Sequence, residues 1–212
     1  MLTKIFMYAI SFLPINSFKV FLYRKIFKLK IGDNVRIGFG SILTSKRLYI
    51  SDDVKVGRFC VIGGGGVKIG ENTLIKNRVS AYGPGDFNLG NNVVVNNNTH
   101  FDLSSNVCVG DNVVFGGRGS EVWTHGYDWK RNKVSASITI EKDVYLGSSV
   151  ILNPGVTICS RTVVCAGSVI YKSITEQNRL VSTHSQYENA YVPLDERSNK
   201  YNDEFGEKVF RK

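Results

Sequence analysis

The residue best suited to chemistry is His125, one of three histidines in the 212-residue chain. It lies in the segment EVWTHGYDWKRNKVSASI, between Trp123 and Trp129 and close to Asp128. An imidazole titrates near neutral pH, so it can take a proton from an attacking hydroxyl or amine with little tuning. A plain alternative is an exposed loop histidine whose aromatic neighbours pack on the body of the protein. The segment alone leaves both interpretations open.

Seven short motifs recur along the chain, and within most of them an aliphatic residue returns six positions later, as at Ile31 and Ile37. Their first residues are 19, 19, 20, 20, 31 and 18 positions apart. A period of six fits neither an amphipathic helix nor a long alternating strand, but it fits three short strands in each turn of a solenoid. The motifs are IGDNVRIG from Ile31, ISDDVKVG from Ile50, IGENTLIK from Ile69, LGNNVVVN from Leu89, VGDNVVFG from Val109, IEKDVYLG from Ile140 and ICSRTVVC from Ile158.

The repeats predict an all-β fold, a parallel β-helix of about seven coils over residues 31–175. The aliphatic residue at each sixth position points into a triangular core, and Gly, Asn, Asp and Ser occupy corners where φ can be positive. One interval is 31 residues long instead of 18 to 20, so a loop of about residues 122–135 must leave the prism. This loop carries His125, and loops on rigid scaffolds are where catalytic groups concentrate.

From Ile138 the chain runs ITIEKDVYLGSSVILNPGVTICSRTVVCAGSVIYKSI. This segment resembles the C-terminal coils of the hexapeptide-repeat acyltransferases, whose patterns I-G-x-x-V-W-I-G, I-x-P-G-V-x-I-G and A-G-S-V-V-x-K correspond to IEKDVYLG, LNPGVTIC and AGSVIYK. Within this family, the sequence pattern most resembles that of bacterial polysaccharide O-acetyltransferases and of galactoside and maltose acetyltransferases. The resemblance covers about residues 31–175 and implies a left-handed β-helix and a homotrimer with active sites between neighbouring prisms.

The resemblance also implies roles for single residues. His125 matches the histidine that serves this family as general base. Ser148 matches the residue whose backbone N–H faces the thioester oxygen as negative charge develops there, which is an oxyanion-hole role. Ala166 matches a backbone contact with coenzyme A, and Lys172 matches a lysine near the phosphates of that molecule.

Acceptor contacts follow less directly from the same alignment. Asn96 falls where galactoside enzymes hold the acceptor with an asparagine, and Trp123 flanks the base. His100 would face the loop of the adjacent subunit, unless it is a polar corner residue stacked within its own coil. Asp128 would orient the imidazole of His125, a task that a backbone carbonyl could equally perform.

Several positions depart from the family pattern. Tyr145 stands in place of the tryptophan of V-W-I-G, and Glu141 and Cys159 replace glycines. The usual G-x-P-A-K after the last coil is replaced by VSTHSQY from Val181 to Tyr187. This replacement puts the family's contact with the distal end of coenzyme A in question.

The function that we expect is transfer of an acetyl group from acetyl-CoA to a hydroxyl of a saccharide, in a cell-surface polysaccharide or a lipid-linked precursor. The sequence contains neither a G-x-S-x-G elbow nor a cysteine in the loop, so direct attack in a ternary complex is favoured over a covalent intermediate. The alternatives are an N-acetyltransferase acting on an amino sugar nucleotide and a non-catalytic β-helix scaffold. The loop with His125 and the AGSVIYK segment argue against the scaffold.

A zinc-dependent γ-class carbonic anhydrase has the same prism but needs histidine ligands close together in one coil. Here His100 and His125 are 25 residues apart and His184 falls outside the repeats, so we expect no metal. His184 is expected to have no role. The four cysteines are scattered without a C-x-x-C pair, which favours reduced thiols and a cytoplasmic protein.

The two ends differ from the repeats. Residues 1–30 hold six basic residues and no acid, and SFKVFLYRKIFKLK suits amphipathic helices that lie on an anionic membrane surface or cap the open end of the prism. The apolar run in residues 5–13 is too short to span a bilayer. Other basic residues are spread among acids, so nucleic-acid binding is not expected. The polar tail, residues 176–212, is expected to pack back along the prism and then fray.

Overall fold

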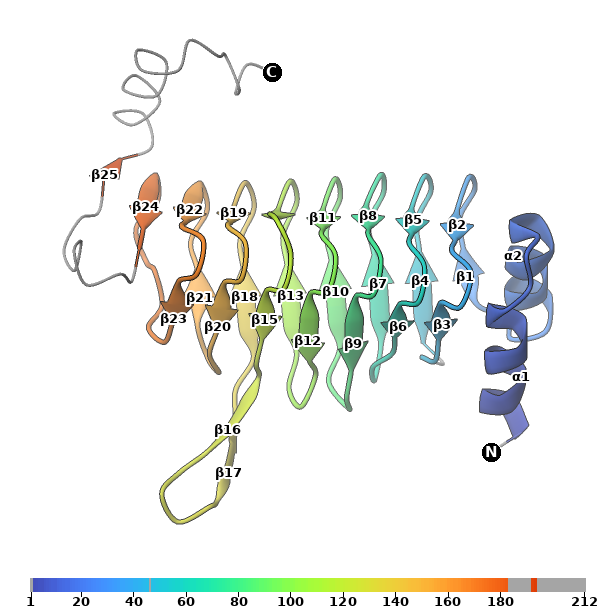
Figure 1. The fold of residues 1–212 in the computed structure, drawn as a ribbon, viewed down its shortest axis with the longest axis horizontal. Helices are drawn as coiled ribbons and strands as arrows, with labels where there is room; N and C mark the ends of the chain where they lie inside the picture. The colour runs from blue at the N-terminus through green and yellow to red at the C-terminus, as the bar shows by residue number, and fades with distance from the viewer. Residues whose placement is uncertain (1, 46, 183–191, 194–212) are drawn as a thin grey trace, which may run out of the picture.

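The computed structural model describes residues 2–45, 47–182 and 192–193. Two short helices, α1 (Leu2–Ser11) and α2 (Asn16–Lys25), are followed by a parallel β-solenoid, from which one hairpin projects (Figure 1). His184 and residues 183–187 of the segment that replaces G-x-P-A-K lie outside the described residues, as does most of the tail.

Three sheets form the faces of the prism. Sheet A holds β1 (Lys30–Ile31), β4 (Leu48–Ile50), β7 (Val67–Ile69), β10 (Phe87–Leu89), β13 (Val107–Val109), β18 (Ile138–Ile140) and β21 (Thr157–Ile158). Sheet B holds β2 (Arg36–Ile37), β5 (Lys55–Val56), β8 (Leu74–Ile75), β11 (Val94–Val95), β14 (Val114–Phe115), β19 (Tyr145–Leu146), β22 (Thr162–Val164), β24 (Arg179–Val181) and β25 (Val192–Pro193). Sheet C holds β3 (Ile42–Leu43), β6 (Val61–Ile62), β9 (Ser80–Tyr82), β12 (His100–Asp102), β15 (Glu121–Val122), β20 (Ile151–Leu152) and β23 (Val169–Ile170).

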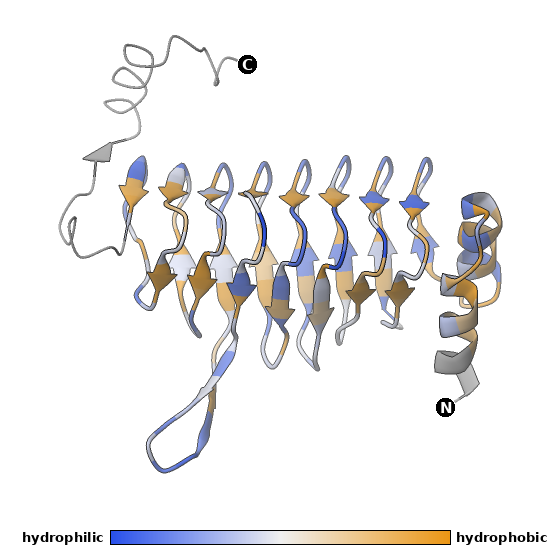
Figure 2. Cartoon of the chain, in the orientation of Figure 1, coloured by the Kyte–Doolittle hydropathy of each residue, from blue (hydrophilic) through white to orange (hydrophobic). Residues whose placement is uncertain are grey.

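The register explains the six-residue period. Except for β25, which pairs antiparallel with β24, each strand of these sheets pairs in parallel with the strand one coil away, so that Ile50 lies beside Ile31 on one side and Ile69 on the other. These side chains point inward and are almost fully buried, and Phe101 packs in the same core against its neighbours Phe87 and Phe115. Hydrophobic residues therefore recur on the strands of all three sheets, while the turns are mostly hydrophilic (Figure 2). The predicted all-β solenoid is confirmed, and it is consistent with a left-handed β-helix.

The turns between sheets A and B explain the recurrent G-D-N signature. Asn72, Asn92 and Asn112 all have positive φ, between 53° and 57°. Their amides stack from coil to coil, since Asn72 Nδ2 donates to Asn92 Oδ1 at 2.9 Å and Asn92 Nδ2 donates to Asn112 Oδ1 at 3.1 Å. Asparagine tolerates this left-handed conformation better than most residues, so the motif satisfies both the backbone and the side-chain hydrogen bonds.

The solenoid has about eight turns rather than the seven that the motifs indicated. After β22, the strand β24 adds another parallel strand to sheet B, with Val164 beside Val181. This last coil begins at Ile174, which forms a parallel bridge with Ile158, but Val181 follows it after seven residues instead of six, so the six-residue period ends near residue 175. The strand pairing extends to Val181.

The two helices close the first coil. Met7, Ile10, Val20 and Tyr23 are buried in one continuous core with the prism. The buried ammonium of Lys19 donates to the carbonyls of Ser11, Ile37 and Gly38 at 3.0 to 3.2 Å, and burial lowers the pKa of this lysine. Capping, one of the two roles considered for residues 1–30, is thus performed by the inner faces of the helices. Neither helix is long enough to cross a bilayer, and the same holds for every described helix.

Candidate functional site

The long interval forms a β-hairpin between β15 and β18, made of β16 (His125–Tyr127) and β17 (Lys133–Ser135), and it points away from the prism (Figure 1). Asp128 closes its turn, because one carboxylate oxygen accepts from the backbone N–H groups of Lys130 and Asn132, both at 2.8 Å, and the other accepts from the Asn132 amide at 3.0 Å. Hydrogen bonds from Asn132 and Lys130 lower the pKa of Asp128. The carboxylate of Asp128 is therefore used to shape the hairpin, at its tip.

A different carboxylate holds the imidazole of His125. Asp102, at the end of β12, places Oδ2 at 2.7 Å from His125 Nδ1. Ser104 Oγ lies 3.2 Å from the same ring nitrogen and donates to Asp102 Oδ1 at 3.0 Å. The Nδ1 atom is thus committed to Asp102 and Ser104. The second ring nitrogen, Nε2, is left without a hydrogen-bond partner among the described residues, which is the arrangement required of a base that receives a proton there.

Thr124 secures the other side of the carboxylate. Its hydroxyl donates to Asp102 Oδ2 at 2.8 Å, and its backbone N–H donates to the same atom at 3.1 Å. Burial raises the pKa of Asp102, but the hydrogen bonds from His125, Thr124 and Ser104 outweigh that effect and lower the pKa to about 2. Asp102 is therefore ionised at neutral pH, and it favours the tautomer of His125 that carries its proton on Nδ1.

An aromatic row runs from this dyad across the outer face of sheet C. The ring of His100 lies between those of Tyr82 and Trp123, and its centroid is 5.3 Å from that of Tyr82 and 5.0 Å from that of Trp123. The centroid of Trp123 lies 6.0 Å from that of His125. His100 Nδ1 is 2.8 Å from Ser80 Oγ, and burial lowers the pKa of this histidine despite nearby carboxylates. Trp123 therefore lies beside the candidate base, and His100 is stacked one ring further along the row; their contact with an acceptor stays a prediction.

The remaining predicted residues lie at other corners of the prism. We call the turns that join sheets B and C (residues 38–41, 57–60, 76–79, 96–99, 116–120, 147–150 and 165–168) the B–C corner. It contains Asn96, Ser148 and Ala166, and Asn96 Nδ2 donates to the carbonyl of Phe115 at 2.8 Å. The turns that join sheets C and A form the C–A corner, and they contain both the hairpin with His125 and, two coils further on, Lys172.

The backbone amides of Ser148 and Ala166 are the contacts predicted for the acyl donor. Neither N–H donates a hydrogen bond within the described residues, although the adjacent Ser149 N–H bonds to Arg118 O at 3.0 Å and Gly167 N–H to Ser148 O at 2.8 Å. A Cβ atom added to Gly147 would lie only 2.4 Å from Ala166 N. The glycine therefore keeps this coil close to the next one, and the two free amides lie on successive coils of the same corner.

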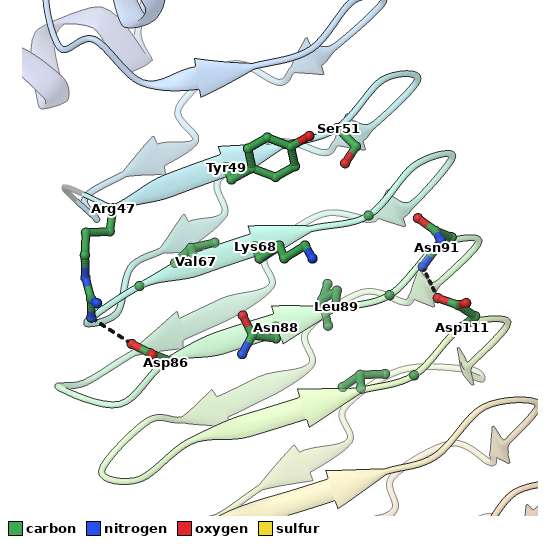
Figure 3. Close-up of a pocket in the computed structure, with 15 residues that line it drawn as sticks. Arg47, Tyr49, Ser51, Val67, Lys68, Asp86, Asn88, Leu89, Asn91 and Asp111 are labelled. Carbon is green, nitrogen blue, oxygen red and sulfur yellow. Dashed lines mark hydrogen bonds and ion pairs between the residues drawn. The ribbon is translucent and has the colours of Figure 1, made fainter.

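The structure also has a shallow depression, with a volume of about 840 Å³, over the outer face of sheet A (Figure 3). Tyr49, Lys68 and Asn88 lie along its floor, and an ion pair of 3.1 Å between Arg47 and Asp86 lies at its edge. Its lining includes none of the residues predicted for the site. Within the described part of the chain, no group of three or more His, Cys, Asp or Glu side chains is arranged to hold a metal ion.

The dyad partner Asp102 was missed by sequence reasoning, which considered Asp128 instead. Asp102 precedes Thr124 by 22 residues, about one coil, so a count of coil lengths would have placed it beside the base. Nearness to His125 in the sequence favoured Asp128, whereas stacking of coils brings Asp102 to the imidazole.

Comparisons with known proteins agree with the fold. Residues 137–172 match the family model described as the hexapeptide repeat of succinyl-transferase. The galactoside O-acetyltransferase of Escherichia coli (strain K12) is 32% identical over 111 residues, which is 50% of this chain and 55% of the relative. The chain thus spans about half the length of the curated relative that it matches.

Comparison with solved structures supports the same fold through one of them, the N-acyltransferase AntD. A mutant of AntD, an N-acyltransferase from Bacillus cereus in complex with dTDP and coenzyme A, is 16% identical and matches 91% of this chain and 98% of its own with a TM-score of 0.52. A hexapeptide-repeat acetyltransferase from Vibrio cholerae, solved with acetyl coenzyme A, is 21% identical over 82% of this chain and 76% of its own, with a TM-score of 0.43. Residues 137–172 therefore match a hexapeptide-repeat family, half of the chain is similar to a galactoside O-acetyltransferase, and the solenoid has the fold of the N-acyltransferase AntD.

Proposed function

We propose that the protein is an acetyl-CoA-dependent O-acetyltransferase that acylates a hydroxyl of a saccharide, with His125 as general base. The observation that carries this proposal is the dyad: Asp102 Oδ2 lies 2.7 Å from His125 Nδ1, on a hairpin that projects from a solenoid of the acetyltransferase type. An isolated loop histidine has no need of a buried carboxylate. A non-catalytic scaffold would not explain why Thr124, Ser104 and His125 all bond to Asp102.

The mechanism follows from these atoms. The acceptor hydroxyl gives its proton to His125 Nε2 as its oxygen attacks the thioester carbonyl carbon. The negative charge that develops on the carbonyl oxygen is stabilised by the free N–H of Ser148. Collapse of the tetrahedral intermediate breaks the carbon–sulfur bond, and the imidazolium returns the proton to the departing thiolate. Asp102 stays ionised and stabilises the imidazolium, so each proton and electron pair is accounted for.

The two halves of this site require a second copy of the chain. His125 lies at the C–A corner and Ser148 at the B–C corner, and the whole of sheet C separates these corners within one prism. Trp129 at the hairpin tip is 87% exposed, and Tyr127 and Val134 are exposed beside it. A neighbouring prism whose B–C corner meets this hairpin would cover these apolar side chains and complete the site. We therefore include a homotrimer in the proposal, with the donor between Ala166 of one copy and Lys172 of the next.

A saccharide hydroxyl is favoured as acceptor because the relative of 32% identity is an O-acetyltransferase for galactosides. The second candidate is acyl transfer to the amine of an amino sugar nucleotide, which is supported by the N-acyltransferase that shares the fold and was solved with dTDP. The same dyad would serve either nucleophile. The four free cysteines fit the reducing cytoplasm, and we propose that compartment.

Contact with the cytoplasmic face of a membrane is part of the proposal. Four phenylalanines are between 48% and 57% exposed: Phe6 on α1, Phe12 just after it, and Phe18 and Phe21 on α2. These aromatic residues stand among lysines, and residues 1–30 contain no acid, so charge favours an anionic lipid surface. Sedimentation with anionic vesicles, compared with zwitterionic vesicles, tests this contact.

The test of the activity is release of thiol from acetyl-CoA with a panel of saccharides and amino sugar nucleotides, for the wild type beside His125→Ala. We expect release that depends on a saccharide and falls by about 10² or more in the variant. Release only with amino sugar nucleotides would select the second candidate. The absence of both turnover and coenzyme A binding in the wild type would leave the scaffold interpretation.

A further inference from the structure

Charge is distributed unequally among the corners of the prism. The turns that join sheets A and B (residues 32–35, 51–54, 70–73, 90–93, 110–113, 141–144 and 159–161) carry the acids Asp33, Asp52, Asp53, Glu71, Asp111, Glu141 and Asp143. The B–C corner carries no acid in any of its seven turns but holds Arg58, Lys76, Arg78 and Arg118, all exposed. The three arginines make no ion pair within the described residues. We call Arg58, Lys76, Arg78 and Arg118 the basic column. Its positive charge is not neutralised by nearby acids, so it is a binding surface for anions.

This basic column begins at the proposed oxyanion residue. Ser148 and Arg118 are on adjacent coils, since Ser148 Oγ donates to Arg118 O at 3.0 Å and Arg118 N donates to Ser148 Oγ at 3.2 Å. Ala166 lies on the opposite side of Ser148, one coil nearer the C-terminus. If the donor extends from Ser148 toward Ala166, the coils that hold Arg118 and Arg78 remain for the acceptor.

In the first two coils, the B–C corner carries exposed aromatic rings. Phe59 has a φ of 56°, a conformation that is uncommon for a bulky residue, and 52% of it is exposed. Its ring covers Gly40, where an added Cβ would lie 2.5 Å from Phe59 Cδ1. Phe39 packs edge-on between Phe59 and Phe12, with centroids 6.0 and 5.5 Å apart. We call Phe59, Phe39 and Phe12 the aromatic ladder. Because Phe12 follows α1, this ladder joins the basic column to the apolar outer face of the helices.

From these observations we infer that the B–C corner binds the acceptor as a saccharide joined through phosphate to a lipid. The saccharide lies near Ser148 and Arg118, the phosphate bonds to Arg78 and Arg58, and the lipid chain lies over the aromatic ladder. Arginine offers bidentate donors that match phosphate oxygens, and contiguous exposed apolar surface marks sites for apolar partners. With coils about 4.8 Å apart, Arg58 lies about 19 Å from the coil of Ser148, which leaves room for a saccharide between them. This inference rests on the proposed function, because that function determines that acetyl-CoA extends from Ser148 toward Ala166.

Calorimetric titration with farnesyl diphosphate tests the site directly, because binding does not require turnover. We expect the wild type to bind this probe, and the pair Arg58→Gln and Arg78→Gln to bind it about tenfold more weakly, as expected when charge-assisted hydrogen bonds are lost. Phe39→Ser with Phe59→Asn should weaken farnesyl diphosphate but leave inorganic pyrophosphate unchanged. Asparagine is chosen to replace Phe59 because it tolerates the positive φ of this position.

The matched control removes two charges from another face of the first and second coils, whereas Arg58 and Arg78 lie on the second and third coils. Arg36 and Lys55 are exposed on the outer face of sheet B, so the pair Arg36→Gln and Lys55→Gln should bind farnesyl diphosphate as the wild type does. Equal weakening in this control, or no weakening in the arginine pair, would overturn the inference. A parallel loss of coenzyme A binding in the arginine pair would also overturn it, because the corner would then belong to the donor.

The acceptor itself distinguishes the inference from the proposed function. In acetyl transfer, the preferred saccharide of the panel is compared with the same saccharide linked through diphosphate to farnesol. We expect a lower KM for the linked form in the wild type and equal KM values in the arginine pair. Acetyl transfer to an acidic polysaccharide that depends on the arginines but not on Phe39 and Phe59 would refute the inference that the acceptor carries a lipid. Failure of all transfer with intact farnesyl diphosphate binding would refute only the activity.

Discussion

Asp102 and His125 are separated by 23 residues, yet Asp102 Oδ2 lies 2.7 Å from His125 Nδ1 because the two residues occupy the same edge of successive coils. Asp102 ends β12, and the next strand of sheet C, β15, leads directly into Thr124 and His125. The rigid parallel pairing of β12 with β15 fixes one partner, and the hairpin fixes the other. The geometry of the dyad is thus set jointly by the pairing of successive coils and by the hairpin.

Replacing Asp102 with Asn should reduce kcat far more than it changes KM. The amide cannot stabilise the imidazolium, and it no longer favours the tautomer with a proton on Nδ1, so we expect kcat to fall by about 10²-fold. Initial rates of thiol release over a range of acceptor concentrations measure this split. Asp128→Asn is the control, because Asp128 bonds only within the hairpin turn. A larger loss from Asp128→Asn than from Asp102→Asn would contradict our assignment.

The stability of the fold should depend on the ionisation of Asp102. Its pKa is lowered from 3.8 to about 2 in the folded protein, so the folded state binds the proton less tightly than the unfolded state. The contribution is complete above about pH 4 and is lost as the pH falls toward 2, and it amounts to about 2 kcal/mol. Urea unfolding at pH 7, 4 and 3 measures it. The midpoint of Asp102→Asn should fall less between pH 4 and 3 than that of the wild type.

The buried lysine of α2 should be required to cap the prism. Lys19→Met leaves the carbonyls of Ser11, Ile37 and Gly38 without their donor, which should lower the free energy of unfolding by about 1 to 3 kcal/mol. The pKa of Lys19 is lowered in the folded state, so wild-type stability should rise as the pH increases from that pKa toward 10.5, and the variant should lack this rise. Thermal unfolding at several pH values measures both effects. Lys25→Met, at an exposed position of the same helix, should leave Tm unchanged.

Two inactive variants should restore activity when they are mixed. His125→Ala removes the base from one corner, and Ser148→Pro removes the backbone N–H from the other. If each site uses His125 of one copy and Ser148 of the next, mixed oligomers contain some intact sites, whereas neither variant alone contains any. Thiol release after joint unfolding and refolding measures this, with analytical ultracentrifugation to establish that each variant assembles alone. Recovery that never exceeds that of the separate variants would place both residues in one protomer.

The sequence determined the architecture of this protein because solenoid coils repeat a local rule. The aliphatic residue at each sixth position, and the Asn or Asp in six of the seven turns that join sheets A and B, predicted strands, core and positive φ from short segments alone. The surplus of residues between Val109 and Ile140 likewise predicted a protruding loop with His125, and the structure shows this loop as a hairpin. These features need no knowledge of contacts between distant residues.

The tertiary structure alone decided which groups meet. Whether Asp102 or Asp128 reaches His125 depends on the stacking of coils and on the hairpin turn, and the closer residue in sequence is the one turned away. The burial of Lys19 also depends on packing of α2 against the first coil, which no periodicity records. The same stacking separates His125 from Ser148 by the width of sheet C. A repeat pattern fixes each coil, but side-chain encounters depend on register between coils and on which corner of the prism each residue occupies.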